Sequence, residues 1–157
     1  MACLTQEPLA VLKWVFGNKR SSTVENSAPP YEEARDIAAS GSAEKREALA
    51  ACEDLSPEFL YYFASDESVD VRAAVAANPG TPLQADVLLA KDRDTEIRKI
   101  LAEKIGRMLP DIRADQSEKL AELAFDVLQT LSEDQAVQVR EIVSQSIKAL
   151  DNIPKPI

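Results

Sequence analysis

The stretch DESVDVRAAVA at residues 66–76 decides the fold, because close copies of it recur along the chain. Residues 92–102 have the sequence DRDTEIRKILA and residues 134–144 have DQAVQVREIVS, with the acid and the arginine in register. One step further back, residues 40–50 have SGSAEKREALA, in which Ser40 replaces the acid. Short helical phrases repeated at fixed spacing are typical of stacked helical repeats.

The acid and the arginine of each copy are predicted to link neighbouring units. Arg98 follows Arg72 by 26 positions, and Arg140 follows Arg98 by 42. An acid just before a helix accepts hydrogen bonds from free backbone amides, and an arginine inside the helix reaches an acid or a loop carbonyl of the next unit. A stacking ladder explains a residue repeated once per unit better than several copies of a catalytic site. The predicted ladder consists of Arg46, Asp66, Arg72, Asp92, Arg98, Asp134 and Arg140.

From residue 31 onward the pattern predicts helix, short turn, helix. Ser56 before Pro57 and Thr81 before Pro82 are predicted as two equivalent helix caps, the second with Gln84 completing a capping box. Val71 and Val75, four residues apart, are expected on one buried helix face, as are their counterparts in the other copies. Expected helices cover residues 31–39, 42–51 and 56–64, and two longer ones near 116–131 and 135–150 begin at the capping boxes of 115–118 and 132–135.

Composition limits the function. The chain has 157 residues, enough for one domain, and carries a net charge of −9 with Lys and Arg scattered among acids. Nucleic acid is therefore not an expected partner. Histidine is absent, and Cys3 and Cys52 lack the paired spacing of a metal site, so neither a metal nor another cofactor is expected. Two isolated thiols favour a reducing, cytoplasmic location, with Cys52 buried.

Residues 1–17 are predicted to form an apolar N-terminal segment and 18–30 a flexible linker. The first segment could form a short helix beginning at Pro8, but it is too short to span a bilayer and lacks the features of a signal peptide. Three interpretations are open: docking on the repeats or on another copy of the chain, shallow membrane association through residues 5–16, and disorder in isolation.

Residues 31–150 are predicted as the repeat domain and 151–157 as a tail. The tail contains two prolines and provides no polar capping repeat. Because a solenoid needs a cap at each end, we expect this chain to be the front part of a longer protein with a further C-terminal region.

The repeated phrase, together with Asn78-Pro79 and Thr81-Pro82, resembles HEAT-like repeats of the leucine-rich-repeat-variant kind. More closely, residues 31–150 resemble the bacterial domain-of-unknown-function family 2336. The resemblance implies a right-handed all-α solenoid of HEAT-like hairpins, an armadillo-like α-α superhelix, and it implies no catalytic residues. The segments that carry it are YEEAR at 31–35, PEFLY at 57–61, AANP at 76–79, QADVLL at 84–89 and AEKIGR at 102–107.

A non-catalytic, regulatory scaffold for protein–protein interaction is the function we expect. Helical-repeat stacks bind partners on the exposed side of one file of helices. That side is mixed to acidic here, so a basic or amphipathic protein is the expected partner. The candidate binding residues are Asp70, Ala73, Ala77, Glu96, Lys99, Glu103, Gln138, Glu141 and Gln145.

Two alternative functions remain open. One is a membrane-linked regulator anchored by residues 5–16. The other is an enzyme, because HEAT-like DNA glycosylases and phycobilin lyases use similar solenoids. A glycosylase needs a basic groove with aromatic residues, whereas Trp14, the single tryptophan, lies in the N-terminal segment. Phe59 and Phe63 are expected in the core, with Tyr61 or Tyr62 half exposed.

Overall fold

The computed structural model describes residues 27–114 and 118–151. All eight elements in these ranges are α-helices and no strand occurs there, which confirms the all-α class. The expected helices are present with their ends shifted by a few residues. Their bounds are α2 (Tyr31–Ser40), α3 (Ala43–Ala50), α4 (Pro57–Phe63), α5 (Val69–Ala77), α6 (Leu83–Leu89), α7 (Thr95–Ala114), α8 (Glu118–Ser132) and α9 (Val137–Asp151).

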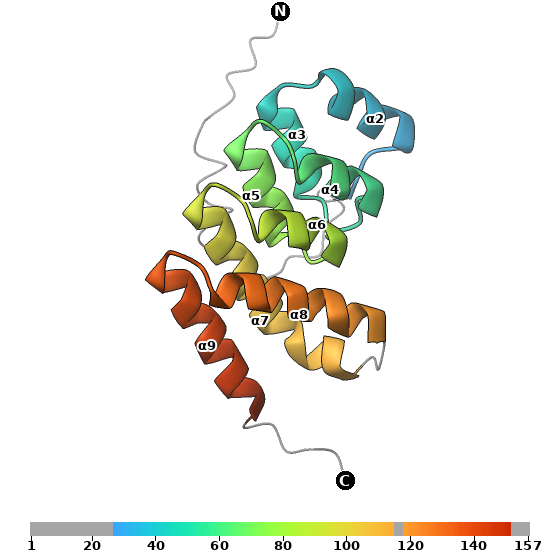
Figure 1. Ribbon diagram of the computed structural model, residues 1–157. Helices are drawn as coiled ribbons and strands as arrows, with labels where there is room; N and C mark the ends of the chain where they lie inside the picture. The colour runs from blue at the N-terminus through green and yellow to red at the C-terminus, as the bar shows by residue number, and fades with distance from the viewer. Residues whose placement is uncertain (1–26, 115–117, 152–157) are drawn as a thin grey trace, which may run out of the picture.

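The helices form two rows of neighbouring helices, which we call files (Figure 1). In the first file α3 contacts α5, α5 contacts α7 and α7 contacts α9. In the second file α4 contacts α6 and α6 contacts α8, while α2 packs beside α3 at one end. Each helix of the second file is joined to the next helix of the first file by a turn that contains one of the repeated acids.

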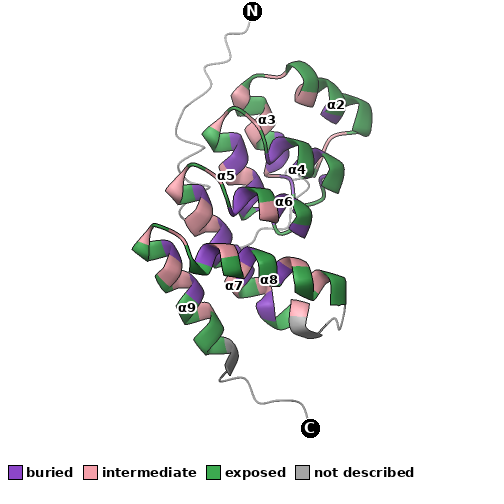
Figure 2. Cartoon of the chain, viewed as in Figure 1, coloured by how far each residue is buried: buried purple, intermediate pink, exposed green. Residues whose placement is uncertain are grey.

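The core lies between the two files (Figure 2). Val71 and Val75 of α5 are both fully buried, as their four-residue spacing predicts. Each aliphatic side chain buried in this way contributes about 1.5–3 kcal/mol to folding, so these positions stabilise the stack more than any surface contact. The equivalent core residues of the other copies are Leu49, Ile97, Leu101, Val139 and Val143, whereas the first copy has the exposed Lys45 at the position of Val71.

The aromatic cluster of α4 divides as expected between core and surface. Phe59 and Phe63 are buried, and the Phe59 ring packs against Tyr31 with their centroids 5.3 Å apart. Tyr61 and Tyr62 remain 49% and 62% exposed. The thiol of Cys52 is also buried, as predicted.

The predicted side-chain caps are wrong. Ser56 makes no side-chain cap hydrogen bond at the start of α4, and the residue that precedes α6 is Pro82 rather than Thr81. The Thr81 hydroxyl instead donates to the carbonyl of Val75, at 2.7 Å, because the free carbonyls at the end of α5 compete for it. In this turn the side chain completes the preceding helix instead of starting the next one.

A second capping prediction, for the turn before α9, is also wrong. Ser132 is the last residue of α8, and its hydroxyl donates to the carbonyl of Gln129 at 2.8 Å. It is therefore unavailable to cap α9, which begins at Val137. The other predicted capping box, at 115–118, lies mostly outside the described residues.

Most of the N-terminal predictions also concern residues outside the described ranges: the apolar segment 1–17 with its anchor at 5–16, and the linker up to residue 26. The last linker residues, 27–30, are described. Here the Ser27 hydroxyl and the Ala28 amide donate to the two carboxylate oxygens of Asp54, at 2.9 and 2.6 Å. The chain thus enters α2 held against the α3–α4 turn.

Candidate functional site

The repeated arginines and acids form three ion pairs that link consecutive turns. In the first, Arg46 donates to both carboxylate oxygens of Asp66, with Nε–Oδ2 at 2.7 Å and Nη2–Oδ1 at 3.0 Å. Arg72 holds Asp92 at 2.7 and 3.3 Å, and Arg98 holds Asp134 at 2.6 and 3.1 Å. We call each pair a rung, and the series from Arg46 to Arg140 the arginine ladder.

The remaining guanidinium nitrogen, Nη1, joins each rung to its own unit. Nη1 of Arg72 donates to the carbonyl of Asp66 at 2.8 Å, and Nη1 of Arg98 donates to that of Asp92 at 2.7 Å. One arginine therefore binds the turn before its own helix through a carbonyl and the following turn through a carboxylate. The rigid fork of donors in arginine suits this double role, which a lysine cannot fill.

The acids of the ladder also begin the helices. Oδ1 of Asp66 accepts the backbone amide of Ser68 at 2.9 Å, and the equivalent oxygen of Asp134 accepts the amide of Ala136 at 2.8 Å. The Arg98 hydrogen bond, followed by that amide, keeps the pKa of Asp134 below its ordinary value. Burial acts to raise the pKa of Asp66, but the hydrogen bonds from Arg46 and Ser68 outweigh it and the pKa is lowered.

A second series of polar contacts joins the units inside the stack. The side-chain amide of Asn78 donates to the carbonyls of Ala50 and Cys52, at 2.7 and 2.9 Å. Lys104, 26 positions after Asn78, directs its ammonium toward the Asn78 carbonyl at 3.4 Å. Its main partner is Oδ1 of Asp86, at 2.6 Å. Equivalent positions thus satisfy the carbonyl ends of successive helices in the first file.

The Asp86–Lys104 pair is almost completely buried, with side-chain exposures of 0% and 2%. Oδ2 of Asp86 has no hydrogen-bond partner in the described part of the chain. Burial raises the pKa of Asp86 to about 6, and the charge of Lys104 only partly opposes this shift. Burial likewise lowers the pKa of Lys104. Neither residue lines either of the two hollows described below, and we treat the pair as structural.

The nine predicted binding residues, which we call the candidate face, occupy three rows of equivalent positions on α5, α7 and α9. Ala73 and Lys99 are half-buried, and the other seven side chains are exposed. Lys99 pairs with Glu96 at 2.9 Å, so the positive charge of the face is neutralised locally. Asp70, Glu103 and Glu141 have no cationic partner within 4.0 Å among the described residues, which leaves the candidate face negative.

Sequence reasoning missed two acids next to this face. Glu44 and Glu47 of α3 stand one repeat step before Asp70 and Ala73 and so extend the same rows onto α3. Burial raises the pKa of Glu47, and the negative charges of Asp70 and Glu44 raise it further. The repeat step of 26 was the signal that could have found them.

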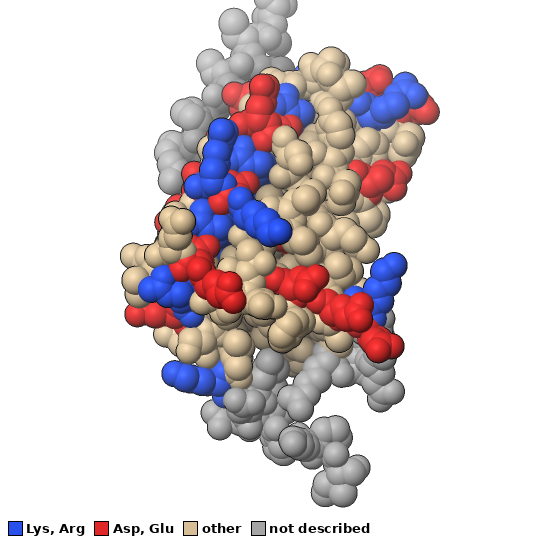
Figure 3. Space-filling view, viewed as in Figure 1, with Lys and Arg blue, Asp and Glu red and all other residues tan. Residues whose placement is uncertain are grey.

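On each helix the ladder arginine lies on a different side from the candidate face, because Arg72 is one position from Ala73 and two from Asp70. In the view of Figure 3, Lys and Arg mix with Asp and Glu on the side where the turns before α5, α7 and α9 lie, and uncharged residues cover much of α4 and α6.

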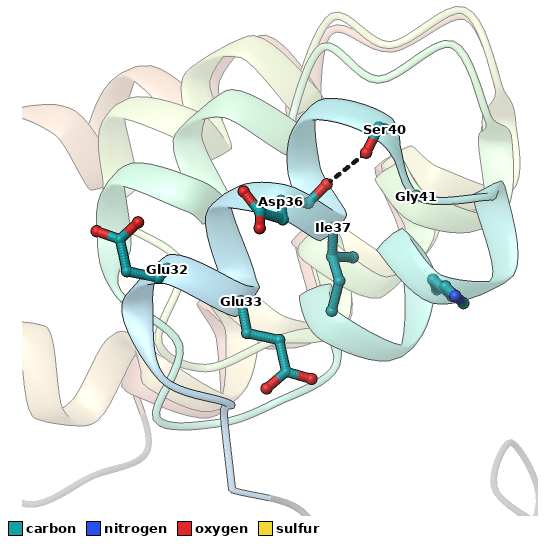
Figure 4. Close-up of a pocket in the computed structure, with 7 residues that line it drawn as sticks. Glu32, Glu33, Asp36, Ile37, Ser40 and Gly41 are labelled. Carbon is teal, nitrogen blue, oxygen red and sulfur yellow. Dashed lines mark hydrogen bonds between the residues drawn. The ribbon is translucent and has the colours of Figure 1, made fainter.

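Two hollows lie at the α2 end. One, of about 390 Å³, is lined by α2 and the start of α3, including Glu33, Asp36 and Lys45. Figure 4 shows the carboxylates spread along α2, with the Ser40 hydroxyl donating to the Asp36 carbonyl at 3.0 Å. The acids do not converge on one point, so the hollow offers no defined binding geometry.

The second hollow, of about 580 Å³, lies above the first rung. Tyr61 and Tyr62 line it together with Ala38, Ala39 and the Arg46–Asp66 pair. Arg46 and Asp66 bind each other, and Glu67, which also lines the hollow, is 92% exposed, so the hollow offers apolar, hydroxyl and acidic surface. Within the described ranges, no group of three or more His, Cys, Asp or Glu side chains could hold a metal ion.

Comparison of the chain with protein-family models, with curated proteins and with solved structures gave no match. Of the helices in residues 27–114 and 118–151, none combines the length and the apolar character needed to cross a membrane. The family resemblance carried by the sequence motifs stays a prediction.

Proposed function

We propose that this chain is a non-catalytic scaffold, a right-handed solenoid of HEAT-like hairpins that binds a basic or amphipathic protein segment on the candidate face. The file of α3, α5, α7 and α9, linked turn to turn by the arginine ladder, supports the solenoid arrangement. Such a file holds its surface rows at fixed spacing, which suits an extended or helical partner.

The observation that carries the proposal is the unbalanced negative charge of this face. Asp70, Glu103 and Glu141 are exposed and lack a cationic partner in the described chain. Burial raises the pKa of Glu47, and repulsion by the negative charges of Asp70 and Glu44 raises it further. A partner with Lys or Arg would relieve this repulsion, and such complementarity mainly increases the association rate and the specificity.

The test is an affinity capture from the source cell's lysate with the full chain and two charge variants. The face variant carries Asp70→Lys, Glu103→Lys and Glu141→Lys. The matched control carries Glu58→Lys, Glu122→Lys and Asp126→Lys, three exposed acids of α4 and α8, so both variants change the net charge equally.

We expect the same proteins to be retained by the unmodified chain and the control and to be lost from the face variant, with helical circular dichroism unchanged in all three. Recovery should fall as salt concentration rises, because exposed charges are screened. Retention of every protein by the face variant, or equal loss from the control, would refute the proposal.

A further inference from the structure

The arginine ladder ends with an incomplete rung at α9. Nη1 of Arg140 donates to the carbonyls of Asp134 and Gln135, as the equivalent atom of Arg72 does to Asp66 and Glu67. Arg140 is thus held by its own turn in the same way as the other ladder arginines. No carboxylate in the described part of the chain pairs with it, so its remaining donors have no acid to bind.

The surface around Arg140 matches the surface by which α7 binds α9. On α7, Arg98 pairs with Asp134, and Gly106 approaches Ser146 so closely that an added Cβ would lie 2.2 Å from its hydroxyl oxygen. Arg98, Ala102 and Gly106 are spaced four residues apart, so all three lie on the side of α7 that faces α9. This side is the docking surface for the α8–α9 hairpin.

The corresponding side of α9 is exposed. Ala102 and Ile105 of α7 are 1% and 0% exposed, whereas their equivalents Ser144 and Ile147 are exposed, Ile147 to 41%. We call Arg140, Ser144, Ile147 and Lys148 the end face. Arg140 and Ile147 lie roughly a quarter of a turn or more from Gln138, Glu141 and Gln145 on the same helix. Ser144 and Lys148 lie closer to Glu141, so the end face and the candidate face share an edge.

We propose that the end face binds a helical hairpin of a partner protein that carries an aspartate in the turn before its second helix. The aspartate would complete the fourth rung with Arg140, as Asp134 does with Arg98. The small side chain of Ser144 permits the close helix contact that Ala102 permits in α7, and Ile147 adds apolar area. This inference does not rest on the proposed function, although the two faces share an edge at Lys148.

Two observations favour a partner protein over a second copy of this chain. At the opposite end of the stack Ser40 occupies the acid position, so head-to-tail stacking of two copies would leave Arg140 without a carboxylate. Antiparallel packing of two α9 helices centred on Ser144 would place Arg140 opposite Lys148 and set like charges against each other. Lys148 also replaces the close-approach Gly106, so an acid is expected on the partner at that point.

The probe is a synthetic peptide with the sequence of residues 118–151, in which Ser146→Glu supplies the acid that should face Lys148. Fluorescence anisotropy of the labelled peptide is followed as the full chain is added. We expect saturable binding that Arg140→Gln weakens at least about tenfold, since a charge-assisted bidentate pair is lost. Asp134→Asn in the peptide should weaken it similarly, and the two changes together should cost little more than either alone.

Two variants control for fold and charge. Ser144→Arg changes an exposed residue, so it should keep the helical signal while blocking the end face and abolishing binding. Arg107→Gln removes one exposed charge from α7 and should leave binding intact. Absence of saturable binding, or binding that persists with Arg140→Gln because the peptide displaces the chain's own α8–α9 hairpin, would overturn the proposal. Arg140-dependent self-association in sedimentation would also overturn it, by making a second copy the occupant.

Discussion

The ladder rungs and the buried Asp86–Lys104 pair use the same charges in opposite ways. Each rung joins a carboxylate to an arginine through two hydrogen bonds, and the side chains are 6–13% exposed. The buried pair has one contact at 2.6 Å, almost no exposure and an oxygen without a partner in the described chain. The side chains of each rung keep some exposure to water and both carboxylate oxygens accept hydrogen bonds, whereas the buried pair depends on a single contact.

The difference shows that burial and hydrogen bonding together decide how stable a charged carboxylate is in the fold. The carboxylate of Asp66 accepts three hydrogen bonds and its pKa is lowered despite burial. Asp86 accepts one, and burial raises its pKa to about 6. Removing one member of the pair should therefore cost more than removing one from a rung.

The largest expected effect is that of Lys104→Met. The substitution keeps most of the side-chain volume but leaves Asp86 buried without a counter-charge, which destabilises a fold by about 3–5 kcal/mol. Urea unfolding followed by circular dichroism at pH 7 measures the loss. Lys91→Met, at an exposed lysine of the preceding turn, is the matched control and should change the free energy of unfolding by less than about 0.5 kcal/mol.

Combining Asp86→Leu with Lys104→Met should restore most of the lost stability. Apolar pairs of similar volume often replace buried ion pairs at little cost. If the double variant is as unstable as Lys104→Met alone, the lysine matters through its packing and its contact with the Asn78 carbonyl, and the comparison with the rungs fails.

The second prediction concerns pH. Because the pKa of Asp86 is raised, the folded state holds its proton more tightly than the unfolded chain does. Its contribution to stability is complete below about pH 4 and is lost as the pH rises to about 6. We expect Asp86→Asn to remove this decline, of the order of 1–3 kcal/mol, when urea midpoints are compared between pH 4 and 6.5.

The rungs should have the opposite pH dependence. The lowered pKa values of Asp66 and Asp134 mean that their contribution is present above about pH 4 and is lost as the pH falls through the folded-state values. Asp86→Asn should leave this loss of stability at low pH unchanged. If the stability of Asp86→Asn still declines fully between pH 4 and 6, Asp86 does not titrate in that range.

The third prediction tests a closed rung. Arg72→Lys keeps the positive charge but cannot hold both the Asp92 carboxylate and the Asp66 carbonyl, so we expect a loss of about 1–2 kcal/mol in the free energy of unfolding. Arg107→Lys, at an exposed arginine of α7, is the control and should be neutral. Equal stability of the two variants would mean that charge alone, without the bidentate geometry, holds the units together.

The rungs could be predicted from the sequence because they repeat. Arg72 and Arg98 occupy the same place in copies of one phrase, and the next phrase supplies the acid, so register alone suggests the partners. The burial of Val71 and Val75 follows from helical spacing in the same way. A contact that repeats can therefore be recognised from the sequence alone.

The buried pair could not be predicted, because it occurs once. One repeat step before Asp86 stands the apolar Leu60, so the acid has no counterpart. One step before Lys104 stands Asn78, which bonds carbonyls as Lys104 does but carries no charge, so the repeat does not predict an ion pair. Charged residues are rarely buried, and both would be assigned to the surface on composition alone. The Thr81 cap failed for a related reason: its side chain had two helix ends within reach, and the sequence does not indicate which one it bonds.

The smallest effect is expected at Lys99, which lies on the candidate face and pairs with Glu96 three residues earlier, at 2.9 Å. The Glu96 side chain is 72% exposed, so the pair is screened by water and salt and should contribute at most about 0.5 kcal/mol. Thermal unfolding of Lys99→Ala and Glu96→Ala should therefore give midpoints close to that of the unmodified chain. A loss comparable to that of Arg72→Lys would mean that exposed pairs stabilise this stack as strongly as closed rungs. The two classes of charge would then no longer be distinguished by how completely they are bonded.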